Sequence, residues 1–240
     1  MLRVLTFGRL TLQLDGTVIT GVATQRRQLA LLALLAVAGD DGMSREKLQG
    51  YLWPASDGER ARHALNQLLY VQRRHHQAAD FVAGKKTLRL PSQGLESDVQ
   101  IFEAALAEGR LEGAVEVYHG PFLDGFFLDG APSFEEWVAE RRNHYAARHL
   151  GALENLADQA AQAGDLEHAL EWSRRASVAD PLNSRLAVAH VDSLLRCEDR
   201  AGALRALRAH CDRLQAELGI SPSSRLLELE ARIQAGDSTG

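Results

Sequence analysis

The stretch SDGERARHALNQLLYVQRRHH, residues 56–76, decides how the first part of the chain is interpreted. At 100° per residue its apolar positions share one side of a helix: Ala61, Ala64, Leu65, Leu68 and Val71. Ser56 and Glu59 have the spacing of a capping box, so we expect the helix to start at Ser56. The opposite side carries polar side chains: Arg62, His63, Asn66, Gln67, Tyr70, Arg73 and Arg74.

Three patterns precede this helix. Apolar residues alternate over 3–19 around Asp15-Gly16, which predicts a short antiparallel sheet. Residues 25–38 are apolar on nearly every face and predict a buried helix, since the run is far below the roughly 20 residues of a membrane span. A further helix starts at Ser44, and Pro54 ends it after Trp53.

A hairpin pattern follows the helix. In residues 81–90 apolar side chains alternate around a turn at Gly84-Lys85. The order of a sheet, three helices and a hairpin is that of a winged helix-turn-helix, and the hairpin is its wing.

The rest of the chain reads as helical and partly repetitive. Residues 90–98, LPSQGLESD, have the composition of a linker. AGDLEHAL at 163–170 and CEDRAGAL at 197–204 are 34 residues apart, the period of tetratricopeptide helix pairs.

We therefore predict a mainly α fold with a small β component. The predicted domains are a winged helix-turn-helix at 1–91, a linker at 92–97 and an all-α tetratricopeptide-like domain at 98–236.

Charge divides the chain in the same way. The net charge is −5, but residues 1–95 carry +6 and residues 96–240 carry −11. The basic first part and the acidic second part indicate different partners. Two cysteines are too few for a disulfide framework, so we expect a reducing, cytoplasmic compartment and no membrane partner.

The polar side of the helix at 56–76 fits the major groove of double-stranded DNA. Asn and Gln can bond adenine and Arg can bond guanine, while basic wing residues neutralise phosphates. A solvated helix face is the alternative, but such a face usually mixes signs, and no acidic residue stands between Glu59 and Asp80. The candidate DNA-binding residues are Arg62, His63, Asn66, Gln67, Tyr70, Arg73, Arg74, Lys85, Lys86 and Arg89.

Residues 3–235 resemble the SARP-type bacterial transcriptional activators. These join an OmpR-like winged helix to a tetratricopeptide-like bacterial transcriptional activator domain. The matching motifs are LWP (52–54), ERARHALNQLLYVQRR (59–74), DVQIFEAAL (98–106), YHGPFLDGF (118–126), FEEWVAERR (134–142), DPLNSRL (180–186) and LQAELGISPSSRL (214–226).

The resemblance implies an activator that binds promoter repeats, often as a homodimer, and recruits RNA polymerase holoenzyme through the sigma subunit. It also implies that polymerase meets the loop before the recognition helix: Pro54, Ala55, Ser56, Asp57 and Gly58. Two positions depart from the family pattern, Glu198 in place of Gly and Leu207 near a usual aromatic, so we expect the second helix pair to be bent or capped differently.

The sequence argues against an enzyme and leaves one other class of function open. An enzyme would need a constellation of reactive side chains, and Glu135-Glu136 and His75-His76 lack the spacing for catalysis or metal binding. No GxxxxGK[ST] motif occurs, so we expect no metal, no nucleotide and no cofactor. The alternative that stays open is a scaffold whose helical repeats bind a protein partner.

Overall fold

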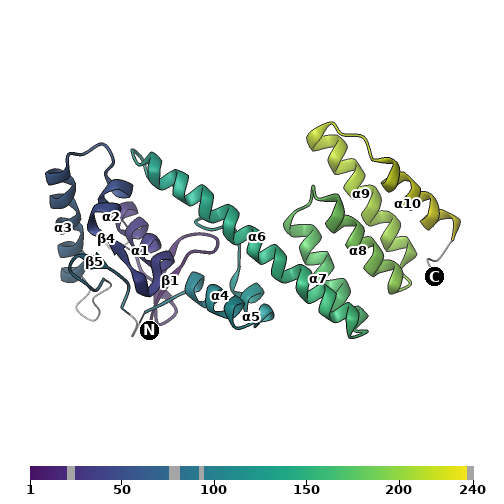
Figure 1. The fold of residues 1–240 in the computed structure, drawn as a ribbon, viewed down its shortest axis with the longest axis horizontal. Helices are drawn as coiled ribbons and strands as arrows, with labels where there is room; N and C mark the ends of the chain where they lie inside the picture. Colours follow the sequence, from purple (N-terminus) through teal and green to yellow (C-terminus); the bar gives the residue numbers. More distant parts are fainter. Residues whose placement is uncertain (21–24, 76–81, 92–94, 237–240) are drawn as a thin grey trace. The chain divides into compact units, whose positions relative to one another are not determined.

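The computed structural model describes most of the chain (Figure 1), as residues 1–20, 25–75, 82–91 and 95–236, with only the backbone given for 72–75. These residues form two compact units, Met1–His149 and Leu150–Gly240, and the boundary between them falls inside helix α6. The units do not coincide with the predicted domains, because the first one also contains the opening helices of the predicted second domain.

The first unit combines two small sheets with helices. Its strands are β1 (Leu2–Leu5), β2 (Thr11–Leu14), β3 (Thr17–Val18), β4 (Met43–Ser44), β5 (Thr87–Leu88) and β6 (Leu95–Ser97). Its helices are α1 (Arg26–Ala38), the short 3-10 helix η2 (Gly39–Asp41), α2 (Arg45–Leu52), α3 (Gly58–His75), α4 (Asp98–Ala107), α5 (Leu111–Val117) and the first part of α6 (Pro132–Gln162). The mainly α fold with a small β component is thus confirmed.

The N-terminal sheet contains more than the predicted hairpins. Strands β1, β2 and β3 form an antiparallel sheet as expected, and the Asp15-Gly16 turn joins β2 to β3. However, β6 adds a parallel strand to the other side of β1, with Leu2 opposite Leu95 and Val4 opposite Ser97. Residues 95–97, which belong to the predicted linker, are therefore part of the sheet, and residues 92–94 lie outside the described ones.

Helix α1 is the central element of the first unit. Every residue from Gln28 to Ala36 is buried, so the helix is enclosed on all sides as its composition predicts. Leucines from β1 and β2 belong to the same hydrophobic cluster as α1, and so do Leu48 of α2 and Leu65 of α3. This core holds α2 and α3 in place.

A buried carboxylate joins the sheet to α4. Asp98 accepts hydrogen bonds from the backbone N–H groups of Thr6 (2.6 Å), Phe7 (2.8 Å) and Val99 (2.8 Å), and from the Thr6 hydroxyl (2.7 Å). Burial raises the pKa of the Asp98 carboxyl, although these hydrogen bonds oppose the shift. The end of β1 and the start of α4 thus share one acceptor group.

The segment between α5 and α6 also forms hydrogen bonds with the residues that follow β1. Leu123 donates its backbone N–H to Thr6 (2.8 Å), and Gly8 donates to Pro121 (2.9 Å). Phe7 then packs among aromatic rings of the helical segments, with Phe102 at 5.1 Å and Tyr145 at 5.4 Å between ring centroids. The predicted winged helix and the start of the predicted helical domain share a single hydrophobic core.

The second unit consists of antiparallel helix pairs. After the end of α6 come α7 (Leu166–Ala179), α8 (Ser184–Arg196), α9 (Arg200–Leu218) and α10 (Ser224–Ala235). The predicted repeat appears as two equivalent turns, in which Asp165 accepts from the His168 N–H and Asp199 accepts from the Gly202 N–H. The expectation that Glu198 would change the capping is wrong. Its φ of 60° matches the 77° of Gly164 at the same place in the repeat, so Glu198 adopts the left-handed turn.

We predict that Asp98→Ala destabilises the first unit. The change leaves the N–H groups of Thr6, Phe7 and Val99 without their acceptor, and each buried orphan costs about 1–3 kcal/mol, so the total should be at least about 3 kcal/mol. Asp98→Asn keeps one oxygen and should lose less. The free energy of unfolding of each variant is measured by urea unfolding followed by the fluorescence of the buried Trp137. The exposed Asp124→Asn serves as the control, and equal stability of all three variants would contradict the assignment.

We also predict that Glu198→Gly stabilises the second unit. A left-handed conformation costs an L-residue about 1–2 kcal/mol, and the entropy of glycine in the unfolded chain offsets about 0.5–1 kcal/mol, which leaves a gain of roughly 0.5–1 kcal/mol. The matched change Gly164→Ala should lower the free energy of unfolding by a similar amount. A Cβ at this position meets no other atom, so the left-handed conformation alone makes the change unfavourable. Urea unfolding followed by the fluorescence of Trp172 measures the stability of both variants. A loss of stability in Glu198→Gly would refute the argument.

Candidate nucleic-acid interface

The N-cap of helix α3 lies one residue later than its sequence suggests. Asp57, not Ser56, caps the helix: its Oδ1 accepts the Arg60 N–H at 2.8 Å and its carbonyl accepts the Ala61 N–H. The predicted capping box is therefore wrong at this helix. The Asp57 carboxylate also lies 3.2 Å from the Arg60 guanidinium, and this negative group stands at the positive end of the helix.

The two faces of α3 separate as predicted. Ala61 and Leu65 are buried, Ala64, Leu68 and Val71 are half-buried, and Leu68 packs against the hydrophobic core. The described candidate residues of the polar face are all exposed: Arg62, His63, Asn66, Gln67 and Tyr70. Arg73 and Arg74 belong to α3, but their side chains lie outside the described residues.

The predicted hairpin forms the wing. Ala83 and Arg89 exchange backbone hydrogen bonds at 2.8 and 3.0 Å, and β5 on the returning side pairs with β4. Phe81, which was expected to start the hairpin, lies outside the described residues. Lys85, Lys86 and Arg89 are exposed, whereas Leu88 and Leu90 point into the core. The wing therefore presents three cations to solvent.

Arg45 connects α3 to the wing, and sequence analysis did not single it out. It is the first residue of α2, and its backbone N–H donates to the Lys86 carbonyl at 3.2 Å. Its guanidinium donates to the Asn66 Oδ1 and, at 3.4 Å, to the Lys85 carbonyl. A basic residue in the first turn of a helix opposes the helix dipole, which is a signal in the sequence at this position but does not identify what Arg45 contacts.

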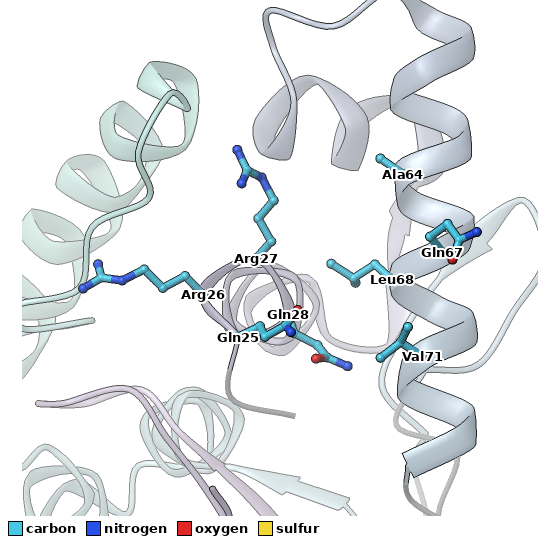
Figure 2. A pocket seen from close by; sticks show the side chains of 8 residues that line it. All are labelled: Gln25, Arg26, Arg27, Gln28, Ala64, Gln67, Leu68 and Val71. Atoms are coloured by element: carbon cyan, nitrogen blue, oxygen red, sulfur yellow. The ribbon is translucent and has the colours of Figure 1, made fainter. Parts of the chain in front are cut away.

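Two shallow hollows flank the polar face of α3. One, of about 460 Å³, lies on the outer face and is lined by Glu59, Arg60, Arg62, His63 and Asn66. The other, of about 410 Å³, lies between α3 and the start of α1 (Figure 2), where Leu68 and Val71 extend toward Gln25 and Gln28.

The arginines beside the second hollow are already engaged within the fold. Arg26 donates to the Phe127 carbonyl at 2.6 Å, and Arg27 donates to the Leu52 carbonyl at 3.2 Å. Both bonds tie α1 to neighbouring segments of the first unit. Of the residues that line this hollow, Gln67 is the one that also belongs to the polar face of α3.

The loop between α2 and α3 is exposed throughout, from Pro54 to Gly58. Trp53, just before it, is half-buried, and the Arg27 guanidinium lies 6.0 Å from the centre of its ring. The loop therefore starts from an anchored residue and ends at the Asp57 cap, so its acidic group is held at a defined place beside the polar face.

Within the described part of the chain, no cluster of three or more histidine, cysteine or acidic side chains is arranged to hold a metal ion. Glu135, one of the paired glutamates, accepts the Leu128 N–H at 2.7 Å and so stabilises a turn. None of the described helices is both long and apolar enough to span a lipid bilayer.

Comparison with known proteins places this architecture in a family. The model of the family described as "bacterial transcriptional activator domain" matches residues 89–234. The chain matches none of the curated proteins. Among solved structures it is similar to EmbR of Mycobacterium tuberculosis in complex with a low-affinity phosphopeptide, with a TM-score of 0.64 and 21% identity over all of this chain and 66% of that one.

The structural likeness concerns the fold, while the family match spans more than half of the chain. Members of this family are transcriptional regulators and not enzymes. The chain therefore belongs to the bacterial transcriptional activator domain family.

Proposed function

We propose that this activator binds double-stranded DNA through α3 and the wing, and that it then recruits RNA polymerase to the adjacent promoter. In this proposal α3 is the recognition helix in the major groove, and the wing contacts the phosphate backbone. The sites are promoter repeats, on which two copies of the chain bind as a dimer.

The observation that carries the proposal is the bridge made by Arg45. Its guanidinium donates both to Asn66 of α3 and to the Lys85 carbonyl of the wing turn. The polar side of α3 and the cations of the wing therefore lie side by side on one surface. That arrangement matches a duplex, in which base edges in the groove are flanked by phosphates.

The chemistry of the two elements supports different roles. Asn66, Gln67, His63 and Arg62 are exposed and polar, so they suit contacts with base edges. Lys85, Lys86 and Arg89 suit phosphates, and Arg73 and Arg74, near the end of α3, are proposed for phosphates as well. Tyr70 is 59% exposed, and we assign its ring to the sugar-phosphate edge of the groove.

The loop from Pro54 to Gly58 is our proposed polymerase contact. It is exposed and directly precedes the proposed recognition helix, so on bound DNA it would lie beside the groove and face the neighbouring promoter elements. Asp57 supplies an acidic group within the otherwise basic first part of the chain, which suits a basic partner such as the DNA-binding region of the sigma subunit.

We predict that replacing both Lys85 and Lys86 with Ala weakens binding to every duplex. Each lost phosphate contact reduces the counterions released, so the slope of log K against log salt should fall by about two. Fluorescence anisotropy with labelled duplexes over a range of salt concentrations measures the slope.

The control for the lysines is the double change of Arg3 and Arg110 to Ala, because both arginines are exposed and paired with glutamates of the same unit. This control should keep the slope of the unaltered chain. If the lysine variant also keeps that slope, the wing does not contact DNA. If the unaltered chain shows no salt-dependent DNA binding, the scaffold alternative is favoured.

We further predict that Asp57→Asn separates DNA binding from activation. Asn caps helices as well as Asp does, so only the charge–dipole contribution of about 0.3–1 kcal/mol should be lost and DNA affinity should stay normal. Transcription in a reconstituted assay and the supershift with polymerase holoenzyme should both decrease. Asp40→Asn removes an exposed acidic group elsewhere in the same unit and should change neither. Full transcription with Asp57→Asn would exclude this residue from the polymerase interface.

A further inference from the structure

The contact between Arg45 and Asn66 determines how the Asn66 amide is oriented. A guanidinium has only donors, so the amide atom that faces it is the oxygen, and the structure has Oδ1 in that position. The Nδ2 group, with its two donors, is left for a ligand. Asn66 is exposed and lies on the rim of the outer hollow of α3, so this amide group is accessible.

Arg45 itself is held firmly at this place. It is half-buried, its backbone N–H is bound by Lys86, and its guanidinium makes a second contact with the Lys85 carbonyl. Together with the bond to Asn66, the contact with Lys85 uses two of the five guanidinium donors. Donors of Arg45 therefore remain beside those of Asn66.

The contact between Arg45 and Asn66 changes which base these two side chains can recognise. Asn reads adenine by donating to N7 and accepting from the N6 amino group through Oδ1. Here Oδ1 already binds a cation, whose charge repels the partly positive N6 amino hydrogens. Guanine offers two neighbouring acceptors, N7 and O6, in the major groove, and two adjacent donor groups match them.

We propose that Arg45 and Asn66 act as a donor-only pair that selects guanine, and that Arg45 is thereby a specificity-determining residue contributed by α2 instead of the recognition helix. The proposal rests on the proposed binding of DNA through α3. It assigns to one position of the binding site a base that Asn66 alone would not prefer.

The experiment is a selection of duplexes from a randomised DNA library by four purified variants and the unaltered chain. Asn66→Ala identifies the position that the pair reads, because only there should the preference disappear. The unaltered chain should prefer guanine over adenine at that position by roughly tenfold, the discrimination of a good two-contact pair. Arg45→Met, which frees Oδ1, should shift the preference to adenine.

Two variants control this result. Arg45→Lys keeps a donor and the charge and should retain guanine, which shows that the change in Arg45→Met is not a folding defect. Arg208→Met removes an exposed arginine that also donates to a side-chain oxygen, that of Glu230 at 2.7 Å, and it should select the same sequences as the unaltered chain.

The outcomes separate the two proposals. If the unaltered chain selects adenine at the position defined by Asn66→Ala, or if Arg45→Met leaves guanine preferred, the donor-only pair is refuted while DNA recognition by α3 stands. If the unaltered chain selects no sequence, the proposed function fails, and this inference fails with it.

Discussion

The buried carboxylate of Asp98 is the constraint on which the first unit depends. It is the first residue of α4, and its acceptor bonds hold the backbone of Thr6 and Phe7 at the end of β1. Burying such a group is costly unless donors surround it, and here four hydrogen bonds from three residues do so. The sheet and α4 are therefore fixed relative to one another, and α1, α2 and α3 contribute to the same core.

Much of this fold follows from local patterns in the sequence. Periodicity identifies the buried face of α3, apolar composition identifies the enclosed helix α1, and the turn at Asp15-Gly16 identifies the hairpin of β2 and β3. Each of these signals depends on residues close together in the chain. The parallel pairing of β6 with β1 was not predicted. It joins residues more than 90 positions apart, and a three-residue strand such as LES has too few side chains to show a period.

The candidate site also contains residues that local patterns in the sequence predict and residues that they do not. The exposed side of α3 and the cations of the wing are visible in the sequence, since one is a helical face and the other a turn. The role of Arg45 is not, because it depends on α2 lying between Asn66 and the Lys85 carbonyl. Likewise the choice between Ser56 and Asp57 as the cap depends on backbone geometry, and both residue types are good caps.

The parallel strand β6 also bears on how such regulators recombine in evolution. Motif boundaries suggest that a winged helix ending near residue 91 could be exchanged between proteins as a module. Here, however, Leu2 and Val4 take their strand partners from residues 95–97, and the acceptor for Thr6 and Phe7 comes from α4. A crossover at residue 91 would separate these groups from their partners, so the exchangeable segment must reach well into the helical region.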